Sequence, residues 1–294
     1  MEKKQNKINL GFPSREWQGQ TIKLFEAAGY NVESENALHR LKIDDSEINC
    51  LLAKTEEIAS YVAEGRLDAG ITQQIWLLEQ KAKVVEVVKL NYGEEVWWNS
   101  KLVLAVPEDS KFKSLKDING KKILTRVPEI VKEYLKKNKI KAEVEWSDRP
   151  TEPKIPMLGD AIVEFTNTGN TLRAHNLKVI DVLMETIPVL IINQKSWQNK
   201  WKREKIENLG LLLKGARIGI DMVGLMLHAS NSMMEEVLKV LPALKKPTVT
   251  HLRGENWFDV FTVAHKREIR TLVPKLKKIG CTDIIEFPLT KVIA

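Results

Sequence analysis

Short apolar runs alternate with stretches of helical periodicity along the first half of the chain. The runs that predict strands are Ile8–Phe12, Ile48–Ala53, Leu67–Thr72, Val84–Leu90 and Leu102–Val106. Helices are predicted between them: one that stops at Gly29, one that Thr55 caps and that ends at Gly65, and the short Gln73–Gln80. Continuous apolar strands joined by helices favour parallel sheets that are covered on both faces.

A second α/β unit is predicted after Pro107. Its predicted elements are the strands Lys122–Thr125, Ala142–Trp146 and Ala161–Phe165 and the helix Pro128–Lys137. Met184–Asn193 is interpreted as one long extended segment that returns to the first unit, and Pro188 within it predicts an edge position or a bulge. Two lobes joined by crossing strands leave a cleft, which is where ligands usually bind.

The last third of the chain predicts a separate domain. After a predicted core-facing helix in Ser196–Gly215, the order is strand, helix, strand, strand, helix, strand, which is the ferredoxin-like split motif. The predicted elements are Val223–His228, Met233–Leu241, Thr248–Leu252, Phe258–Ala264, Glu268–Ile279 and Ile284–Glu286. The predicted domains are therefore residues 1–107 plus 183–215 for the first lobe, 108–182 for the second lobe and 216–294 for the C-terminal domain.

Composition narrows the classes of function. The 294 residues are 43% hydrophobic and 29% charged, which is enough apolar surface for real cores. The net charge is +7, but the charges are mixed along the chain, so phosphate ligands are expected as partners and nucleic acid is not. No apolar run reaches the length of about 18 residues that a membrane span needs, so no membrane partner is expected. The two cysteines lie far apart without metal-binding spacing, which favours reduced thiols and a cytoplasmic protein.

The segment from Asp160 to Leu172 carries the strongest chemical signal. An apolar strand ends in a polar turn, and a helix is expected from Leu172 to Leu177. Backbone N–H groups and hydroxyls in such a turn, with a helix N-terminus behind them, can hold a phosphate, and Gly169 permits close approach and a positive φ. Glu164 lies four residues after Asp160 on the same strand face, so these carboxylates could accept from sugar hydroxyls and stabilise positive charge at a sugar C1. An ordinary strand–turn–helix with a capping threonine remains open.

These residues resemble the phosphoribosyl-diphosphate (PRPP) loop of ATP phosphoribosyltransferases, the first enzymes of histidine biosynthesis. The resemblance extends over nearly the whole chain and is to the long form, which has a C-terminal regulatory domain. The matching stretches are Ile43–Thr72, Leu102–Ser110, Pro150–Leu177, Trp201–Ala216 and Leu241–Leu252. The resemblance implies two α/β lobes of the type II periplasmic-binding-protein fold. It also implies a reaction that joins N1 of ATP to C1 of PRPP and releases diphosphate, with Mg²⁺ on the diphosphate.

The same resemblance implies roles for individual residues. The loop that holds the 5-phosphate would comprise Thr166, Thr168, Gly169, Asn170, Thr171 and Leu172. Asp160 and Glu164 match its acidic lead-in, and Glu152 matches an acid near the ribose; these three are the catalytic candidates. The adenine itself is the nucleophile, so no catalytic triad is expected.

The C-terminal domain of the family binds histidine as a feedback inhibitor and helps to form oligomers from dimer to hexamer. Leu244 and Thr248 fall where the family contacts histidine. Core packing and a strand hydroxyl are equally good interpretations of these two side chains.

The first lobe departs from the family pattern in three places. The first strand is followed by Ser14 and Arg15 where the family has lysine and glycine, so the lysine expected to meet substrate phosphates is missing. Thr72 is followed by Gln73 rather than glycine, and Ile75 stands in place of an aspartate.

An arginine expected before the family's next acidic motif is also absent, since Ala37 occupies its place and Arg40 lies nearby. Arg15, Arg40 and Thr72 are therefore the candidates for the ATP or diphosphate side. PRPP binding is better supported than ATP binding. Two hypotheses stay open: an active enzyme, or a divergent non-catalytic or altered-specificity paralogue that binds a nucleotide or phosphosugar in the same cleft. Trp76 and Trp146 are further candidates for lining that cleft.

Overall fold

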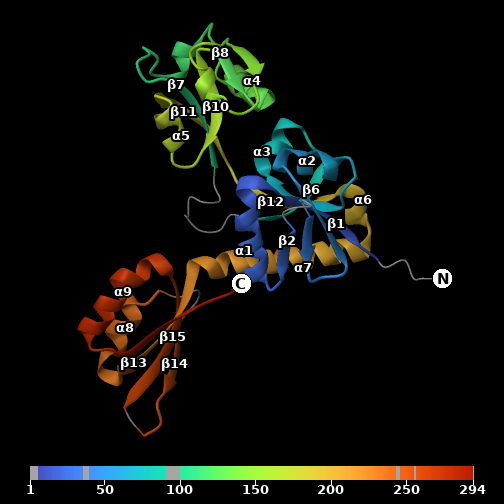
Figure 1. The fold of residues 1–294 in the computed structure, drawn as a ribbon. Helices are drawn as coiled ribbons and strands as arrows, with labels where there is room; N and C mark the ends of the chain where they lie inside the picture. The colour runs from blue at the N-terminus through green and yellow to red at the C-terminus, as the bar shows by residue number, and fades with distance from the viewer. Residues whose placement is uncertain (1–5, 36–39, 91–99, 243–245, 255, 294) are drawn as a thin grey trace, which may run out of the picture. The chain divides into compact units, whose positions relative to one another are not determined.

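The chain divides into two compact units, which are described one at a time (Figure 1). The computed structural model describes residues 6–35, 40–90, 100–242, 246–254 and 256–293. The first unit comprises Met1–Thr21 with Val32–Gly210, and the second comprises Ile22–Asn31 with Leu211–Ala294. Within the described ranges, no helix is long and apolar enough to cross a bilayer.

The first lobe of the first unit is a seven-stranded sheet in the order β2-β3-β4-β1-β5-β12-β6. Its strands are β1 (Ile8–Pro13), β2 (Val32–Glu35), β3 (Arg40–Ile43), β4 (Ile48–Ala53), β5 (Ala69–Gln73), β6 (Val84–Lys89) and β12 (Pro188–Asn193). The helical segments are η1 (Arg15–Trp17), α2 (Thr55–Ala63), α3 (Gln74–Glu79) and α6 (Gln194–Gln198). Helix α1 (Gln18–Ala28) begins in the first unit and continues into the second, which includes Ile22–Asn31. Strand β1 is parallel to β4 and β5, whereas β12 is antiparallel to β5 and β6, so this sheet is mixed rather than parallel.

Close contact between α2 and the sheet depends on glycine. A Cβ built on Gly70 would lie 2.4 Å from Cγ2 of Ile58, so a larger residue at Gly70 would push α2 away. Ile58 itself is fully buried. Lys54, not Thr55, is the N-cap of α2, and Thr55 is the first residue inside the helix.

The second lobe is a five-stranded sheet in the order β11-β7-β10-β8-β9. Its strands are β7 (Ser100–Pro107), β8 (Lys122–Thr125), β9 (Glu143–Trp146), β10 (Ala161–Thr166) and β11 (Leu177–Thr186). Its helical segments are η3 (Leu115–Ile118), α4 (Pro128–Lys137), η4 (Glu152–Lys154) and α5 (Asn170–Ala174). Strands β8, β9 and β10 are parallel, and β7 is antiparallel to both β10 and β11.

Four sequence-based expectations were wrong in this region. Strand β7 lies in the second sheet, although its residues were expected in the first lobe. The expected single strand Met184–Asn193 is instead the end of β11 and the whole of β12, which belong to different sheets. Pro188 is the first residue of an interior strand, a place where its missing N–H is tolerated. The helix expected over Leu172–Leu177 is the single turn α5, and Leu177 already begins β11.

Helix α4 takes its N-terminal cap from the first lobe. Pro128 occupies the first turn, and the next two N–H groups, of Glu129 and Ile130, donate to the two carboxylate oxygens of Glu79 at 3.1 and 3.0 Å. A negative side chain is favourable at that end of a helix because the free N–H groups there carry partial positive charge. Glu79 is the last residue of α3, so this contact joins the two lobes.

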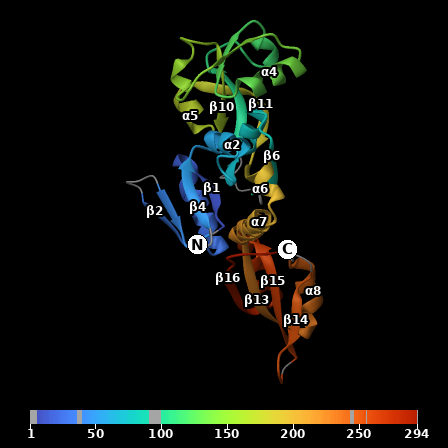
Figure 2. The same ribbon diagram turned by 90° about the vertical axis from the view of Figure 1, so that its right-hand side faces the viewer.

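The second unit contains a four-stranded antiparallel sheet in the order β14-β15-β13-β16. Its elements are β13 (Met222–Ser230), η5 (Asn231–Met233), α8 (Met234–Val240), β14 (Thr248–His251), β15 (Trp257–His265), α9 (Lys266–Ile279) and β16 (Thr282–Pro288). Both helices, α8 and α9, cover the same face of the sheet (Figure 1), and the second view shows the strands of this sheet with α8 beside them (Figure 2). This order and topology confirm the predicted ferredoxin-like arrangement. Helix α7 (Lys200–Asp221) contributes its first half to the first unit and its second half to the second.

Asp68 is a buried carboxylate that joins three elements of the first unit. It accepts from the N–H of Asn9 at 3.0 Å and from Oγ of Ser196 at 2.6 Å, and it pairs with Lys202. Burial raises the pKa of Asp68, but the bonds from Asn9, Lys202 and Ser196 outweigh it and hold the pKa below its ordinary value.

We expect Asp68→Asn to lower the free energy of unfolding by about 2–3 kcal/mol, because charge-assisted hydrogen bonds at a buried site are lost. The carboxylate's pKa is lower in the folded than in the unfolded state, so its stabilisation is present above the unfolded value near 4 and is lost as pH falls through the lower folded value. Urea unfolding at pH 7 and in an acid series measures both effects. The exposed Asp109→Asn is the matched control, and equal losses in the two variants would contradict the prediction.

Candidate active site

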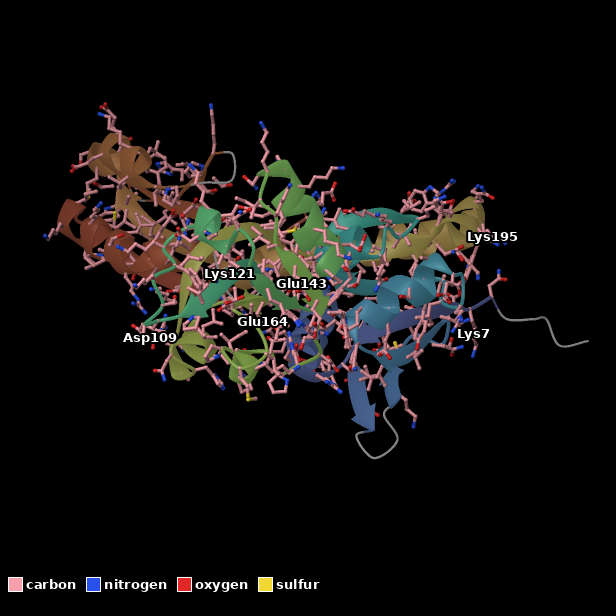
Figure 3. The ribbon with its side chains drawn as sticks, turned by 90° about the horizontal axis from the view of Figure 1, so that it is seen from above. Lys7, Asp109, Lys121, Glu143, Glu164 and Lys195 are labelled. Atoms are coloured by element: carbon pink, nitrogen blue, oxygen red, sulfur yellow. The ribbon has the colours of Figure 1, made fainter. Side chains whose placement is uncertain are left out.

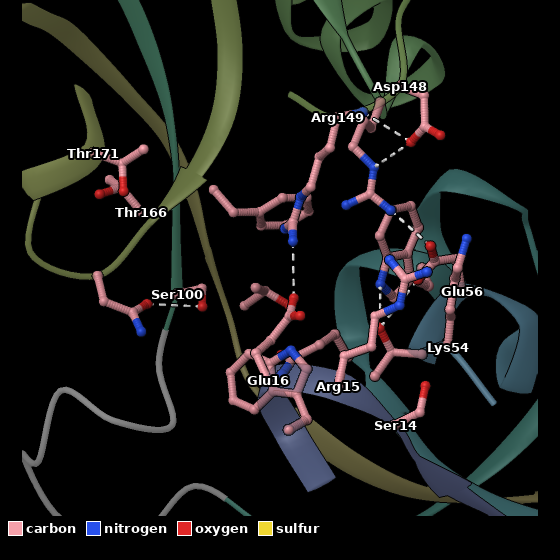
Figure 4. A pocket seen from close by; sticks show the side chains of 18 of the residues that line it. Ser14, Arg15, Glu16, Lys54, Glu56, Ser100, Asp148, Arg149, Thr166 and Thr171 are labelled. Atoms are coloured by element: carbon pink, nitrogen blue, oxygen red, sulfur yellow. Dashed lines mark hydrogen bonds and ion pairs between the residues drawn. The ribbon is translucent and has the colours of Figure 1, made fainter. Parts of the chain in front are cut away.

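A polar cavity of about 400 Å³ lies within the first unit, where strands of both sheets end (Figure 4). First-lobe residues reach it after β1, β4 and β5, and second-lobe residues reach it after β8, β9 and β10. The lining residues with charged side chains are Arg15, Glu16, Lys54, Glu56, Arg126, Asp148 and Arg149. Ligands of open α/β sheets bind at the carboxyl ends of strands, so this cavity is the candidate active site.

The predicted phosphate loop forms one wall of this cavity. Thr166, Thr168, Asn170 and Thr171 all line it. Gly169 has φ +74°, and its N–H donates to Oγ1 of Thr166 at 2.8 Å, which closes the turn. Helix α5 behind the loop is a single turn, so loop N–H groups and hydroxyls, rather than a long helix dipole, are the groups available to an anion.

The loop is tied to its surroundings through two further contacts. Oγ of Ser100 donates to Oδ1 of Asn167 at 2.9 Å, which joins the loop to the start of β7. The Arg173 guanidinium donates to the carbonyl of Thr168 at 3.0 Å. The side chain of Leu172 is buried in the core of the second lobe, so only its backbone is available to a ligand.

The three acids predicted to be catalytic are not brought together in the cavity. Glu164 is buried beside it, where its carboxylate accepts from Oγ1 of Thr151 at 2.7 Å and from the N–H of Phe165 at 2.9 Å. Asp160 accepts from the N–H of Lys122 at 2.9 Å at the opposite end of β10. Since a strand rises about 3.3 Å per residue, Asp160 lies roughly 20 Å from Thr166. Glu152 is half-buried in η4 and is absent from the lining residues.

The remaining predicted residues have different positions. Thr72 is fully buried, and its hydroxyl donates to the carbonyl of Thr55 at 2.6 Å, so it supports the start of α2. Arg40 begins β3, but its side chain lies outside the described part of the structure. Leu244 lies outside the described residues as well, and Thr248 is exposed at the start of β14.

Arg15 reaches the cavity from an unusual backbone conformation. It lines the cavity directly after β1 with φ +58°, in the left-handed region that glycine adopts without cost. The family resemblance expects glycine at this position. The chain has therefore placed a cation at a point where the backbone bends sharply.

Six charged residues of the cavity were missed by sequence reasoning: Glu16, Lys54, Glu56, Arg126, Asp148 and Arg149. Arg126 Nη2 lies 2.6 Å from Oε1 of Glu56, and its guanidinium lies 5.2 Å from the ring centre of Trp76. Each of these residues lies directly after a predicted strand or within a few residues of its end. This position was the sequence feature that could have indicated a place in the site.

Two tryptophans were predicted as possible cleft residues. Trp76 lines the cavity, where its Nε1 donates to Oγ1 of Thr55 at 3.0 Å and its ring packs on Phe165 with centroids 5.7 Å apart. Trp146 is 61% exposed and is not among the lining residues.

A second cation–carboxylate pair crosses the cavity. Arg149 Nη1 lies 2.9 Å from Oε1 of Glu16. Burial opposes the charge on each, but their mutual contact outweighs it, so the pKa of Glu16 is lowered and the pKa of Arg149 is raised. The N–H of Arg149 also donates to Asp148, which lowers the pKa of that carboxyl.

The donor set of the cavity bears on the predicted Mg²⁺. Among the described residues, no group of three or more His, Cys, Asp or Glu side chains could hold a metal ion. Glu16, Glu56 and Asp148 each face an arginine. These residues fit an ion that enters with substrate phosphates, since Mg²⁺ commonly keeps water and phosphate ligands, and they do not form a protein cage.

Two α/β lobes with a polar cavity at their strand ends define a class of two-lobed ligand-binding folds. The structure is similar to the ATP phosphoribosyl transferase (HisG:HisZ) complex from Thermotoga maritima, with a TM-score of 0.57, 21% identity and coverage of 70% of this chain and 98% of that chain. It is also similar to the periplasmic aliphatic sulphonate binding protein SsuA from Escherichia coli, with a TM-score of 0.50, 12% identity and coverage of 73% of each chain. The predicted fold, two lobes of the periplasmic-binding-protein type and a ferredoxin-like domain, is confirmed.

Sequence comparison then gives the family. The ATP phosphoribosyltransferase family model matches residues 54–215, and the model for the C-terminal domain of HisG matches residues 220–291. ATP phosphoribosyltransferases from Thermodesulfovibrio yellowstonii and Chlorobium phaeobacteroides are each 40% identical to this chain. The first covers 97% of this chain and 98% of its own length, and the second covers 100% of both. The chain belongs to the ATP phosphoribosyltransferase family, in its long form, and the prediction of a pentosyltransferase enzyme of histidine biosynthesis is confirmed at that level.

We expect Thr151→Val to lower the free energy of unfolding by about 1–3 kcal/mol, because the buried Glu164 carboxylate loses its hydroxyl donor. Chemical unfolding followed by tryptophan fluorescence measures the loss. Thr168→Val makes the same change at an exposed position and is the control. If both variants unfold at the same urea concentration, the Thr151–Glu164 bond is not a stabilising contact.

Proposed function

We propose that this chain joins N1 of the ATP adenine to C1 of PRPP and releases diphosphate, the first step of histidine biosynthesis. The observation that carries the proposal is the Thr166–Thr171 loop, which opens into a polar cavity in a chain 40% identical to ATP phosphoribosyltransferases over nearly its full length. The loop supplies hydroxyls and N–H groups for a sugar phosphate, and the opposite wall supplies cations for the other anionic groups.

The proposed chemistry needs positioning and charge stabilisation. The adenine N1 lone pair forms the new bond to C1, and the bond from C1 to the diphosphate oxygen breaks with its electron pair leaving on diphosphate. Arg15 and Lys54 line the cavity and would stabilise the negative charge that develops on the leaving group. Glu164 would act as a positioning residue, since its carboxylate holds Thr151 beneath the loop strand. Asp160 holds the main chain of Lys122 and is given no chemical step.

Mg²⁺ is proposed to enter with the diphosphate group of PRPP. It would neutralise charge on the diphosphate, and phosphate oxygens and water would supply most of its ligands. Glu56 and Asp148 are the cavity carboxylates that could add a protein ligand.

Feedback and assembly are proposed for the C-terminal unit. We propose that histidine binds there near Thr248, which β14 presents to solvent, and that the chain forms homo-oligomers between dimer and hexamer. The similar Thermotoga maritima structure is described as a complex, which supports assembly as a property to test in this chain. We propose the cytoplasm as its location, which the free thiols Cys50 and Cys281 support.

A second candidate function is a paralogue with altered acceptor specificity. Gln73 lines the cavity and is 4% exposed, and its Oε1 has no hydrogen-bond partner among the described residues. A buried acceptor without a donor is costly, so a ligand N–H or O–H at this position would be favoured. The family pattern has glycine here, so this amide could select a different acceptor.

The deciding experiment incubates the purified chain with PRPP, ATP and Mg²⁺ and follows the absorbance of phosphoribosyl-ATP. Product formation at a rate proportional to enzyme supports the proposal. A folded protein that binds PRPP in calorimetry but forms no product with ATP favours the second candidate, and a panel of other purine nucleotides then identifies the acceptor.

We expect Gly169→Val to weaken PRPP binding about 10-fold or more, because a β-branched residue is strained at φ +74° and the turn that presents the loop must change. Calorimetric titration with PRPP measures the effect. Gly120→Val tests the same kind of substitution at φ +75° with no atom within 4 Å of the added Cβ, away from the cavity. Equal PRPP affinity in the two variants would remove the loop from the site.

A further inference from the structure

Two ion pairs cross the cavity, and each joins an acid of the first lobe to an arginine of the second. Glu56 pairs with Arg126 at 2.6 Å, and Glu16 pairs with Arg149 at 2.9 Å. A carboxylate that pairs with an arginine offsets its charge and uses some of its N–H donors. The two pairs therefore decide which cations of the cavity a phosphate ligand can use.

The pairs differ in how firmly they are held. The Arg126 side chain is 12% exposed, stacks on Trp76 and has Asp148 3.8 Å from its Nε in addition to Glu56. Arg126 is thus enclosed on several sides. The side chains of Arg149 and Glu16 are 45% and 53% exposed, and ion pairs that are so exposed to water stabilise a protein little. The Glu16–Arg149 pair is the one that a ligand can replace at small cost.

The position of Arg149 suits a second anion. Figure 4 shows its side chain between the wall that carries Thr166 and Thr171 and the wall that carries Glu56. If the loop holds a sugar phosphate, a diphosphate on the same ligand extends from the loop into the cavity. A guanidinium offers paired N–H donors that match phosphate oxygens better than a single carboxylate oxygen does.

We infer that Arg149 is a diphosphate-binding residue of this cavity, and that Glu16 occupies it in the absence of ligand and is replaced by diphosphate oxygens. The inference rests on the proposed function, since it assigns one part of the same site. It also explains how a chain that has Ser14 in place of the family's lysine keeps a cation for this group. Glu16 then lowers the affinity for diphosphate, because each binding event must first break its bond to Arg149.

The test is a double-mutant cycle in the full-length protein, with inorganic diphosphate as the calorimetric probe. Arg149→Met is expected to weaken diphosphate binding about 10-fold to 100-fold, the loss typical of a charge-assisted contact. Glu16→Gln is expected to tighten it about 3-fold to 10-fold. In the Arg149→Met background, Glu16→Gln should have no effect, because no arginine remains to be released.

Three results would overturn the inference. The first is an equal gain from Glu16→Gln with and without Arg149, which would reduce the effect to general electrostatics. The second is an unchanged diphosphate affinity in Arg149→Met. The third is a loss of ribose 5-phosphate binding without a loss of diphosphate binding, which would place Arg149 with the loop.

Matched controls separate these outcomes from folding and from the proposed function. Arg66 and Glu64 form an exposed pair at 2.7 Å outside the cavity lining, so Arg66→Met and Glu64→Gln make the same charge changes and should leave diphosphate affinity within about twofold. Thermal unfolding of all variants checks the fold. If the wild-type protein turns over ATP and PRPP but Arg149→Met leaves the diphosphate affinity unchanged, only the inference is overturned. A wild-type chain that binds neither diphosphate nor PRPP overturns both.

Discussion

The site depends on one geometric constraint: strands of two separate sheets end at the same cavity. Strands β1, β4 and β5 run in one direction in the first lobe, and β8, β9 and β10 run in one direction in the second. The segments that follow these strands therefore meet, and their polar side chains form the two walls of the cavity. Charged side chains of both signs are interspersed over the rest of the first unit in Figure 3, so charge alone does not mark the site. Its distinguishing feature is the convergence of strand ends.

Much of the fold was predictable because apolar runs mark buried strands. The bounds of β4, β8 and α4 agree with those predicted from sequence. The sheet to which a strand belongs was not predictable in the same way. Strand β7 is buried along nearly its whole length, and a fully apolar strand fits the interior of either sheet. Its placement depends on pairing with β10 and β11. Most of β11 is only partly buried, without a strict alternation, and its first part was not recognised as a strand.

The residues of the site also differ in whether a local sequence pattern could predict them. The Thr166–Thr171 loop was predictable because its chemistry lies in six consecutive residues. Arg126 and Arg149 were not, because each is a single basic residue in a chain with 46 lysines and arginines, and only the folded strands bring them together. Asp160 and Glu164 were expected on one strand, but Asp160 lies just before β10, and alternation along a strand gives the face and not the distance to the ligand.

The carboxylate of Glu79, at the end of α3, completes the first turn of α4 from the other lobe. The capping carboxylate comes from a residue about 50 positions earlier in the chain. An excised second lobe would therefore leave the first N–H groups of α4 without this acceptor. Cooperative unfolding of both lobes follows from such sharing. The recombination of lobes between relatives would have to preserve an acid at this point of α3, although that acid does not line the cavity.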